Sequence, residues 1–356
     1  MKRWSRVELL ATASRAHAKS QKYVKRETAK KKRKVRWNEV KITLSPRFNF
    51  SADYGPTIDS LRVLKDQTLP TGSNGKRRFF IDLSTVKRIS VAGALVLAAE
   101  IDRWRRLRRN RLSPRDTTNW DPEVKRRLFS LGFFDLLNVD LKNPDIDAEE
   151  VSEVVILPMV TDNRVDGQKL YEIGEYLAAI GNIFEQDPTV YPALTEAAYN
   201  SFLHAYPEDH EYEYPPLRKR WWATACWYPK EAVVRFFVYD QGVGIPATLP
   251  RSHLWENIRQ HLAKLPMIGS LTDDASRLIE AAIDVSRTSL KGGHGKGLSD
   301  VVAPILGNQS ARVRILSGKG SLICYGDGDV ERRDESLHVG GTLIEWTIPA
   351  VAGHQE

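Results

Sequence analysis

Residues 232–246 read AVVRFFVYDQGVGIP, an apolar run that ends in an acidic, glycine-rich turn. The apolar run over 232–239 predicts a buried strand. Asp240 follows directly, and Gly242 and Gly244 let the backbone turn sharply and come close to a ligand. A carboxylate at the end of a strand can accept a hydrogen bond from an exocyclic amine, such as N6 of adenine. An ordinary glycine-rich turn is the alternative, which the complete DxGxGIP pattern disfavours.

A second motif lies upstream, in the segment LTEAAYNSFLHAYP at residues 194–207. Glu196, Asn200 and His204 are spaced four apart, which places them on one face of a helix. The amide oxygen of Asn200 can ligate a hard cation such as Mg²⁺. Glu196 can take a proton from a water or hydroxyl that faces a γ-phosphate. Taken alone, a polar stripe on a helix is more often a solvated face.

The third motif is GGHGKGL at residues 292–298, which opens a helix predicted over 297–306. Backbone N–H groups of a glycine-rich loop that leads into a helix N-terminus form an anion site, and Lys296 adds a positive charge. The motif is not a P-loop, because Gly297 stands where a Ser or Thr is required. Leu290 also stands where a P-loop has its first glycine.

Taken in chain order, ExxxN at residues 196–200, DxGxGIP at 240–246, GGHGKGL at 292–298 and then Gly341-Thr342 before the last predicted strand (342–348) resemble the nucleotide boxes of the GHKL family over residues 165–349. The resemblance implies an α/β (α+β) fold, a two-layer α/β sandwich that binds ATP and Mg²⁺, with residues 247–291 as a mobile lid. It implies Glu196 as the catalytic base, Asn200 as the magnesium ligand and Asp240 as the adenine contact. The implied ATP contacts are Asn200, Asp240, Gly242, Gly244, Gly293, His294, Gly295, Lys296, Gly297, Leu298 and Thr342.

The motif that contains Glu196 also indicates a branch of the family. GHKL ATPases and anti-sigma-factor serine kinases have Glu at the position of Glu196, whereas histidine kinases commonly have His. The segment EAAYNSFLHAYP is most similar to the anti-sigma kinase branch. We see no long dimerisation helix with a phosphoacceptor His, and only residues 350–356 follow the last strand, where a gyrase-like protein needs a transducer.

Three functions follow from this resemblance. The leading one is an ATPase whose lid closes on Mg-ATP and which signals to a protein or nucleic-acid partner. The second is a protein serine/threonine kinase of the anti-sigma-factor type. The third is a nucleotide-binding interaction module with little turnover. The same Glu196 serves hydrolysis and phosphotransfer, because both reactions remove a proton from an attacking oxygen.

The segment FFIDLSTVKRISVAGALVLAAEI at residues 79–101 predicts a strand over 79–83 and a helix over 92–107. It resembles a strand–loop–helix unit of STAS domains, which implies a STAS-like α/β domain over 38–155, before an ATP-binding domain over 156–356. STAS regulators offer a phosphoacceptor Ser or Thr in the loop before the helix. Val91 and Ala92 stand there in this chain, with only Ser90 beside them. We therefore expect a scaffold that is not phosphorylated.

Positive charge is concentrated at the N-terminus, in a basic arm over residues 1–37. Residues 1–36 hold 14 Lys and Arg and 2 Glu, a balance of +12, so the rest of the chain sums to 8 − 12 = −4. A basic arm attracts polyanions, which predicts contact with nucleic acid. A solvated tail is the alternative.

Composition restricts the remaining classes of function. The 2 Cys lie apart with no CxxC spacing, which disfavours a zinc site or a disulfide framework and fits a reducing compartment. No apolar run is long enough to span a membrane. We expect a cytoplasmic protein whose partners are ATP, a further protein and, through the arm, nucleic acid, with no membrane contact. A homodimer is left open.

Overall fold

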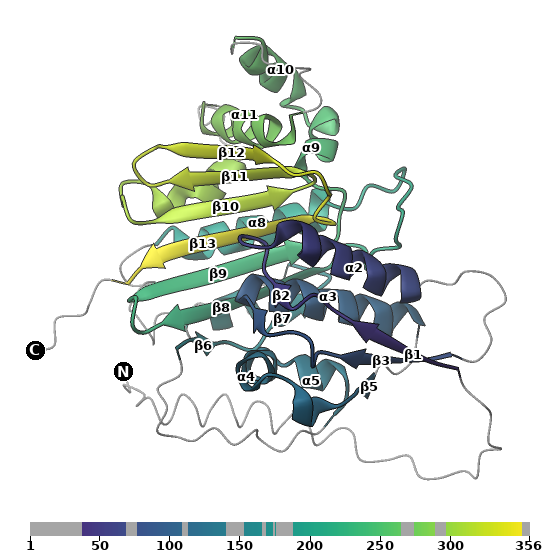
Figure 1. The fold of residues 1–356 in the computed structure, drawn as a ribbon. Coiled ribbons are helices and arrows are strands. Elements are labelled where there is room, and N and C mark those ends of the chain that lie inside the picture. Colours follow the sequence, from purple (N-terminus) through teal and green to yellow (C-terminus); the bar gives the residue numbers. More distant parts are fainter. Residues whose placement is uncertain are drawn as a thin grey trace, which may run out of the picture.

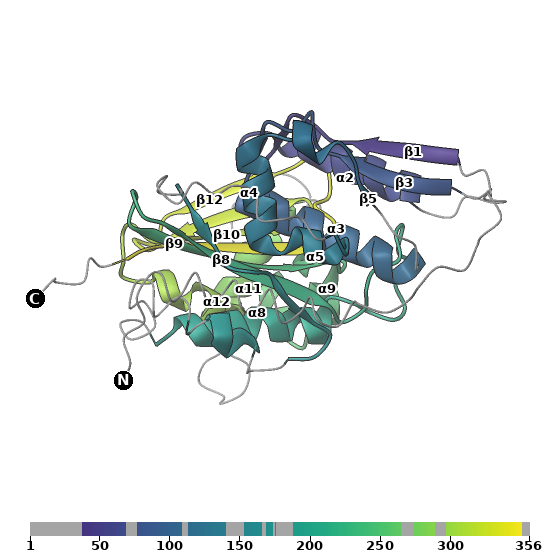
Figure 2. The same ribbon diagram turned by 90° about the horizontal axis from the view of Figure 1, so that it is seen from below.

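A computed structural model describes residues 38–68, 77–108, 113–139, 153–165, 169–173, 175, 188–264, 274–288 and 297–350. The fold is of the α+β class, with a large antiparallel sheet and a small parallel one. Figure 2 shows four layers: the small sheet, a layer of helices, the large sheet, and a second group of helices. None of the helices in these ranges combines the length and apolar character that a membrane span requires.

The N-terminal unit, residues 38–139, contains the small parallel sheet in the order β1-β3-β5 and a separate parallel pair, β2 and β4. Its strands are β1 (Asn38–Thr43), β2 (Arg47–Phe48), β3 (Arg77–Asp82), β4 (Arg88–Ile89) and β5 (Ser113–Pro114). Its helices are α2 (Tyr54–Thr68), α3 (Val91–Arg108), η1 (Thr117–Asn119), α4 (Pro122–Leu131) and α5 (Phe133–Leu136).

The predicted helix over 92–107 is confirmed as α3, and its sequence explains its place between the two sheets. Every residue from 91 to 104 is buried, so both sides of the helix are covered. Residues 91–99 are all apolar or glycine, which favours a place inside the protein. The buried charges that follow, on Glu100, Asp102 and Arg103, form ion pairs. Ser90 caps the helix, because its Oγ accepts a hydrogen bond from the backbone N of Gly93 at 3.0 Å.

The C-terminal unit, residues 153–350, contains the large sheet in the order β12-β11-β10-β13-β9-β8-β6, with β7 also paired to β8 (Figure 1). Its strands are β6 (Val155–Ile156), β7 (Val160–Asp162), β8 (Trp221–Tyr228), β9 (Val233–Asp240), β10 (Arg312–Ser317), β11 (Gly320–Tyr325), β12 (Val330–Asp334) and β13 (Thr342–Pro349). Its helices are α8 (Val190–His204), α9 (Ile245–Thr248), η2 (Leu249–Arg251), α10 (Trp255–Ala263), α11 (Ala275–Thr288), α12 (Leu298–Val302) and η4 (Ala303–Ile305).

Side chains alternate between the two faces of the large sheet. On β9, Phe236 and Val238 point to one face, where they pack in one core with residues of α8, α11 and α12. Phe237 and Tyr239 point to the other face and pack in one core with residues of the N-terminal unit. This alternation follows from the period of two in a strand. The N-terminal unit and the large sheet therefore share a continuous apolar core.

Several predicted elements differ from the structure in their bounds. The apolar pattern over 125–137 predicts one short helix, whereas the structure has two, because Gly132 between them has a left-handed φ of 84°. The pattern over 154–160 predicts one strand, which is divided into β6 and β7. The helix expected over 297–306 ends at Val302, and η4 with Pro304 in its first turn follows. The pattern over 168–186 predicts a further helix, and most of it lies outside the described residues, as do the basic arm and parts of the proposed lid.

Candidate functional site

Asp240 is the last residue of β9, and its carboxylate is buried where β9, β13 and α8 meet. Oδ1 accepts hydrogen bonds from the backbone N of Gly242 at 2.8 Å and of Thr342 at 3.3 Å. Oδ2 lies 3.1 Å from the hydroxyl of Ser201 on α8. Burial raises the pKa of Asp240 to about 6, and the three hydrogen bonds oppose that rise. A charge so buried is expensive, which is typical of functional carboxylates.

The glycines after Asp240 are required for packing of the loop against the protein itself. A Cβ on Gly242 would stand 2.2 Å from the carbonyl oxygen of Ala205 at the end of α8. Gly244 has a left-handed φ of 87°, and a Cβ there would meet the backbone N of Gly318 at 2.8 Å. The close approach seen at these glycines is therefore to other backbone segments, which lock the loop in place.

Thr342 sits opposite Asp240 because β13 and β9 pair antiparallel in that register. Its Oγ1 lies 2.8 Å from Oγ of Ser317, at the end of β10. The Ser317 hydroxyl also accepts a hydrogen bond from the backbone N of Ile245 at 2.7 Å. A chain of polar contacts thus links Thr342, beside the buried carboxylate, to the first residue of α9.

Glu196 and Asn200 lie on α8, as the sequence predicts, and are half-buried. Burial and the nearby carboxylate of Asp300 on α12 raise the pKa of Glu196, while contact with Asn200 lowers it. Among the described residues, the buried Nδ2 of Asn200 makes no hydrogen bond within the usual limits of distance and angle. Glu196 is thus a base with raised proton affinity, beside an amide with unused hydrogen-bonding capacity.

His204 lies one turn further along α8, near His253. Partial burial of the imidazole and electrostatic repulsion by that second histidine lower the pKa of His204. The residue as a whole is exposed, at the edge of this face of α8.

The third motif is described only at its end. Gly293, His294, Gly295 and Lys296 lie outside the described residues. Gly297 precedes α12 with a φ of 45° and a ψ of −133°, which favours glycine. Leu298 begins α12 and packs, half-buried, against the core of the sheet and its helices.

Sequence reasoning missed several residues that complete the site: Ser201, Asp300, Ser317, Gln241 and Tyr206. Ser201 carries the contact from α8 to Asp240, although Asn200 beside it is the residue that the motif singles out. The backbone N of Gln241 donates a hydrogen bond to the hydroxyl of Tyr206 at 2.9 Å. This bond holds the loop after β9 against the segment that follows α8. Ser201 directly follows Asn200, and Gln241 directly follows Asp240. This adjacency to a motif residue is the one feature of the sequence that pointed to them.

Within the described ranges, no group of three or more His, Cys, Asp and Glu side chains is placed to hold a metal ion. A magnesium ion held by one protein oxygen, with phosphate and water as its other ligands, does not require such a group. No protein-family model, curated protein or solved structure matches the chain. The geometry of the site is therefore the basis on which a function is assigned.

Proposed function

We propose that residues 156–356 form an ATP-binding domain of the GHKL type, that residues 38–155 form a STAS-like domain, and that the protein is an ATPase that signals to a partner. The observation that carries the proposal is the buried carboxylate of Asp240. It is in contact with Ser201 on α8 and with Thr342 on β13, which lie 39 and 102 residues away in the chain. The GHKL resemblance implies that Asp240 of the DxGxGIP motif and Thr342 meet at one place.

The hydrogen-bonding capacity of Asp240 fits adenine. An ionised carboxylate offers about four acceptor positions. Gly242, Thr342 and Ser201 use three of them. One position is left for the exocyclic N6 amine, and the hydroxyl of Thr342 stands beside it for a water-mediated contact. The carboxylate is already oriented by its three donors, so little reorganisation accompanies binding.

The residues on α8 fit the phosphate end of ATP. Asn200 offers one hard oxygen, Oδ1, and its Nδ2 is buried without a partner among the described residues. Magnesium at this position would neutralise charge on the phosphates. Glu196 would hold the attacking water and accept its proton. A general base works best when its pKa lies near the operating pH, and the raised pKa of Glu196 moves it toward neutral pH.

The proposed lid has a core of its own in its described part. Leu249, Ile258 and Leu262 of η2 and α10 pack with Leu278 and other residues of α11 in a cluster separate from the two larger cores. The hydrogen bond from Ile245 to Ser317 ties the start of this region to Thr342. We propose that the lid closes on bound ATP and that this tie links closure to the adenine site.

Phosphate release from Mg-ATP by the full chain tests the proposal, in the presence and absence of candidate partners. Glu196→Gln should keep ATP affinity and lower the rate about 10²–10⁴-fold, as expected for loss of a general base. Glu231→Gln is the matched control, because Glu231 is an exposed carboxylate that pairs with Arg235 at the other end of β9. It should leave the rate unchanged.

The outcomes of this experiment separate the candidate functions. Label transfer to a partner protein that depends on Glu196 would establish the kinase of the anti-sigma-factor type instead of the ATPase. ATP binding with equal, slow turnover in both variants would establish a nucleotide-binding module. Absence of ATP binding by the wild-type chain would contradict the GHKL assignment itself.

A further inference from the structure

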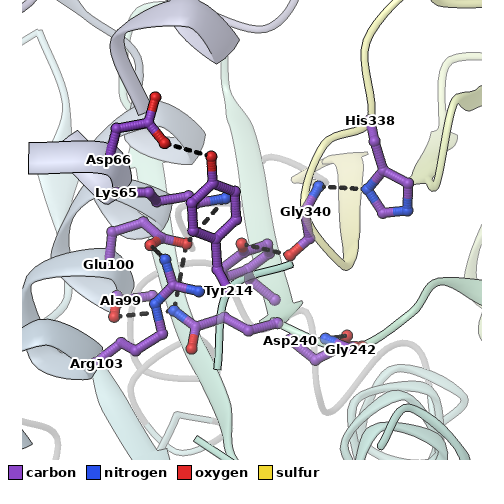
Figure 3. A network of polar contacts seen from close by, with 12 residues as sticks. Lys65, Asp66, Ala99, Glu100, Arg103, Tyr214, Asp240, Gly242, His338 and Gly340 are labelled. Carbon is purple, nitrogen blue, oxygen red and sulfur yellow. Dashed lines mark hydrogen bonds and ion pairs between the residues drawn. The ribbon is translucent and has the colours of Figure 1, made fainter. Parts of the chain in front are cut away.

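A buried cluster of charged side chains lies between the N-terminal unit and the large sheet (Figure 3). Its members are Lys65 on α2 and Glu100 and Arg103 on α3, which are 8%, 2% and 7% exposed. Glu100 forms an ion pair with Arg103, and its Oε1 lies 3.7 Å from Nζ of Lys65. Buried charges are tolerated only where such partners are held in place. The carboxylate of Glu100 is therefore a fixed acceptor at this interface.

Gln241 connects this cluster to the candidate site. It directly follows Asp240 and is 4% exposed. Its Nε2 donates to the carbonyl oxygen of Ala99 at 3.1 Å and approaches Oε1 of Glu100 at 3.4 Å. The amide has only this orientation open to it, because the reverse would set its oxygen against a carbonyl and a carboxylate.

The loop after β9 is thus held from two sides. Asp240 points to the candidate site, where it accepts from the backbone N of Gly242. Gln241 points to the N-terminal unit, as expected for adjacent residues at the end of a strand. The backbone N of Val243 then donates to the carbonyl oxygen of Ala205 at 2.9 Å. A displacement of α3 would act on the backbone of Gln241 and so on the direction of the Asp240 carboxylate.

We propose that Gln241 is a positioning residue through which α3 of the N-terminal unit fixes the loop over 240–244 and sets the affinity for ATP. The affinity part of this inference rests on the proposed function, whereas the fixing of the loop does not. Because coupling of two equilibria is reciprocal, bound ATP should in turn strengthen the docking of the N-terminal unit on the sheet.

Hydrogen exchange of the full chain without nucleotide tests whether the loop is fixed in this way. Gln241→Met keeps the length of the side chain and removes both donor contacts. Arg314→Met is the matched control, because Arg314 donates to the carbonyl oxygen of Phe50 at 3.0 Å and to Oγ of Ser51, and so ties the same two units elsewhere. We expect about tenfold faster exchange over 240–246 in Gln241→Met alone. Equal exchange of this segment in both variants would overturn the proposal.

Calorimetric titration with Mg-ATP tests the consequence for affinity. Gln241→Met should bind about tenfold more weakly than wild type, which equals about 1.4 kcal/mol, and Arg314→Met should bind as wild type does. Gln241→Glu sets two carboxylates against each other and should also bind weakly.

The two experiments fail in different ways. If the wild-type chain does not bind ATP, the proposed function is wrong, and the exchange experiment still decides whether Gln241 fixes the loop. If ATP binds but both methionine variants weaken it equally, Gln241 is general interface packing and the proposal fails.

Discussion

Asp240→Asn should remove a contribution to stability that weakens as pH rises. Burial raises the pKa of Asp240, whereas an ordinary ion pair lowers the pKa of its carboxyl, so the two contributions depend on pH with opposite signs. The substitution keeps the shape of the side chain. Oδ1 can still accept from Gly242 and Thr342, and the new amide can donate to Oγ of Ser201, whose proton can go to the carbonyl oxygen of Ala197 at 2.9 Å. We therefore expect a folded variant that has lost one buried, titrating charge.

The magnitude follows from the pKa of Asp240, which burial raises from 3.8 to about 6. Between these values the folded chain binds more protons at this group than the unfolded chain does. The free energy of unfolding therefore falls as pH rises from about 4 to about 6 and levels off above that. The difference of 2.2 pKa units corresponds to about 3 kcal/mol at 1.36 kcal/mol per unit.

Urea denaturation of wild type and Asp240→Asn at pH 4, 5, 6 and 7 measures this difference. The stability of wild type relative to the variant should fall by about 2.4 kcal/mol across the series, because the unfolded carboxyl is already partly ionised at pH 4. Asp82→Asn is the control with the opposite sign. Burial favours a higher pKa for Asp82, but hydrogen bonds from Lys41 and Ser84 outweigh it and lower the pKa. Parallel profiles for wild type and Asp240→Asn would refute the reasoning.

Two further predictions concern the metal and the N-terminal unit. Mg²⁺ should strengthen ATP binding by the wild-type chain about tenfold, or about 1.4 kcal/mol, and Asn200→Ala should abolish this effect while leaving ATP binding in EDTA unchanged. Retention of the full magnesium effect in calorimetry would show that the ion does not need Asn200. Incubation with labelled ATP should leave residues 88–93 unmodified by mass spectrometry, because the Ser90 hydroxyl caps α3 and its loss from that role costs about 1 kcal/mol. A phosphorylated Ser90 would instead indicate regulation by the chain's own kinase activity.

Strong apolar patterns made part of the fold predictable. The runs 221–228 and 232–239 correspond to β8 and to β9 within one residue, because both faces of these strands are covered and nearly every position is apolar. β12 was missed for the opposite reason. Four of its five residues are exposed at the edge of the sheet, so its sequence VERRD has no apolar period. α2 was also missed, and the Gly and Pro in its first turn are typical of a loop.

The candidate site was predictable only where a motif is continuous in the sequence. Asp240 and the face of α8 with Glu196 and Asn200 follow from local spacing. The contact between Gln241 and Glu100 joins residues 141 positions apart, and each residue alone resembles an ordinary polar position. The effect of Asp300 on Glu196 likewise depends on how α12 packs on α8, which no local pattern encodes.

The measurement that tests the central claim most directly is a comparison of ATP with GTP by calorimetry on the full chain. Adenine presents an N6 amine that the carboxylate of Asp240 can accept from, whereas guanine presents an oxygen there that the same carboxylate repels. The proposed site predicts that ATP binds and that GTP binds about 10–10²-fold more weakly, since a mismatched buried polar group costs about 1–3 kcal/mol. This preference should be lost in Asp240→Asn. No binding of ATP, or equal binding of both nucleotides that Asp240→Asn leaves unchanged, would contradict it.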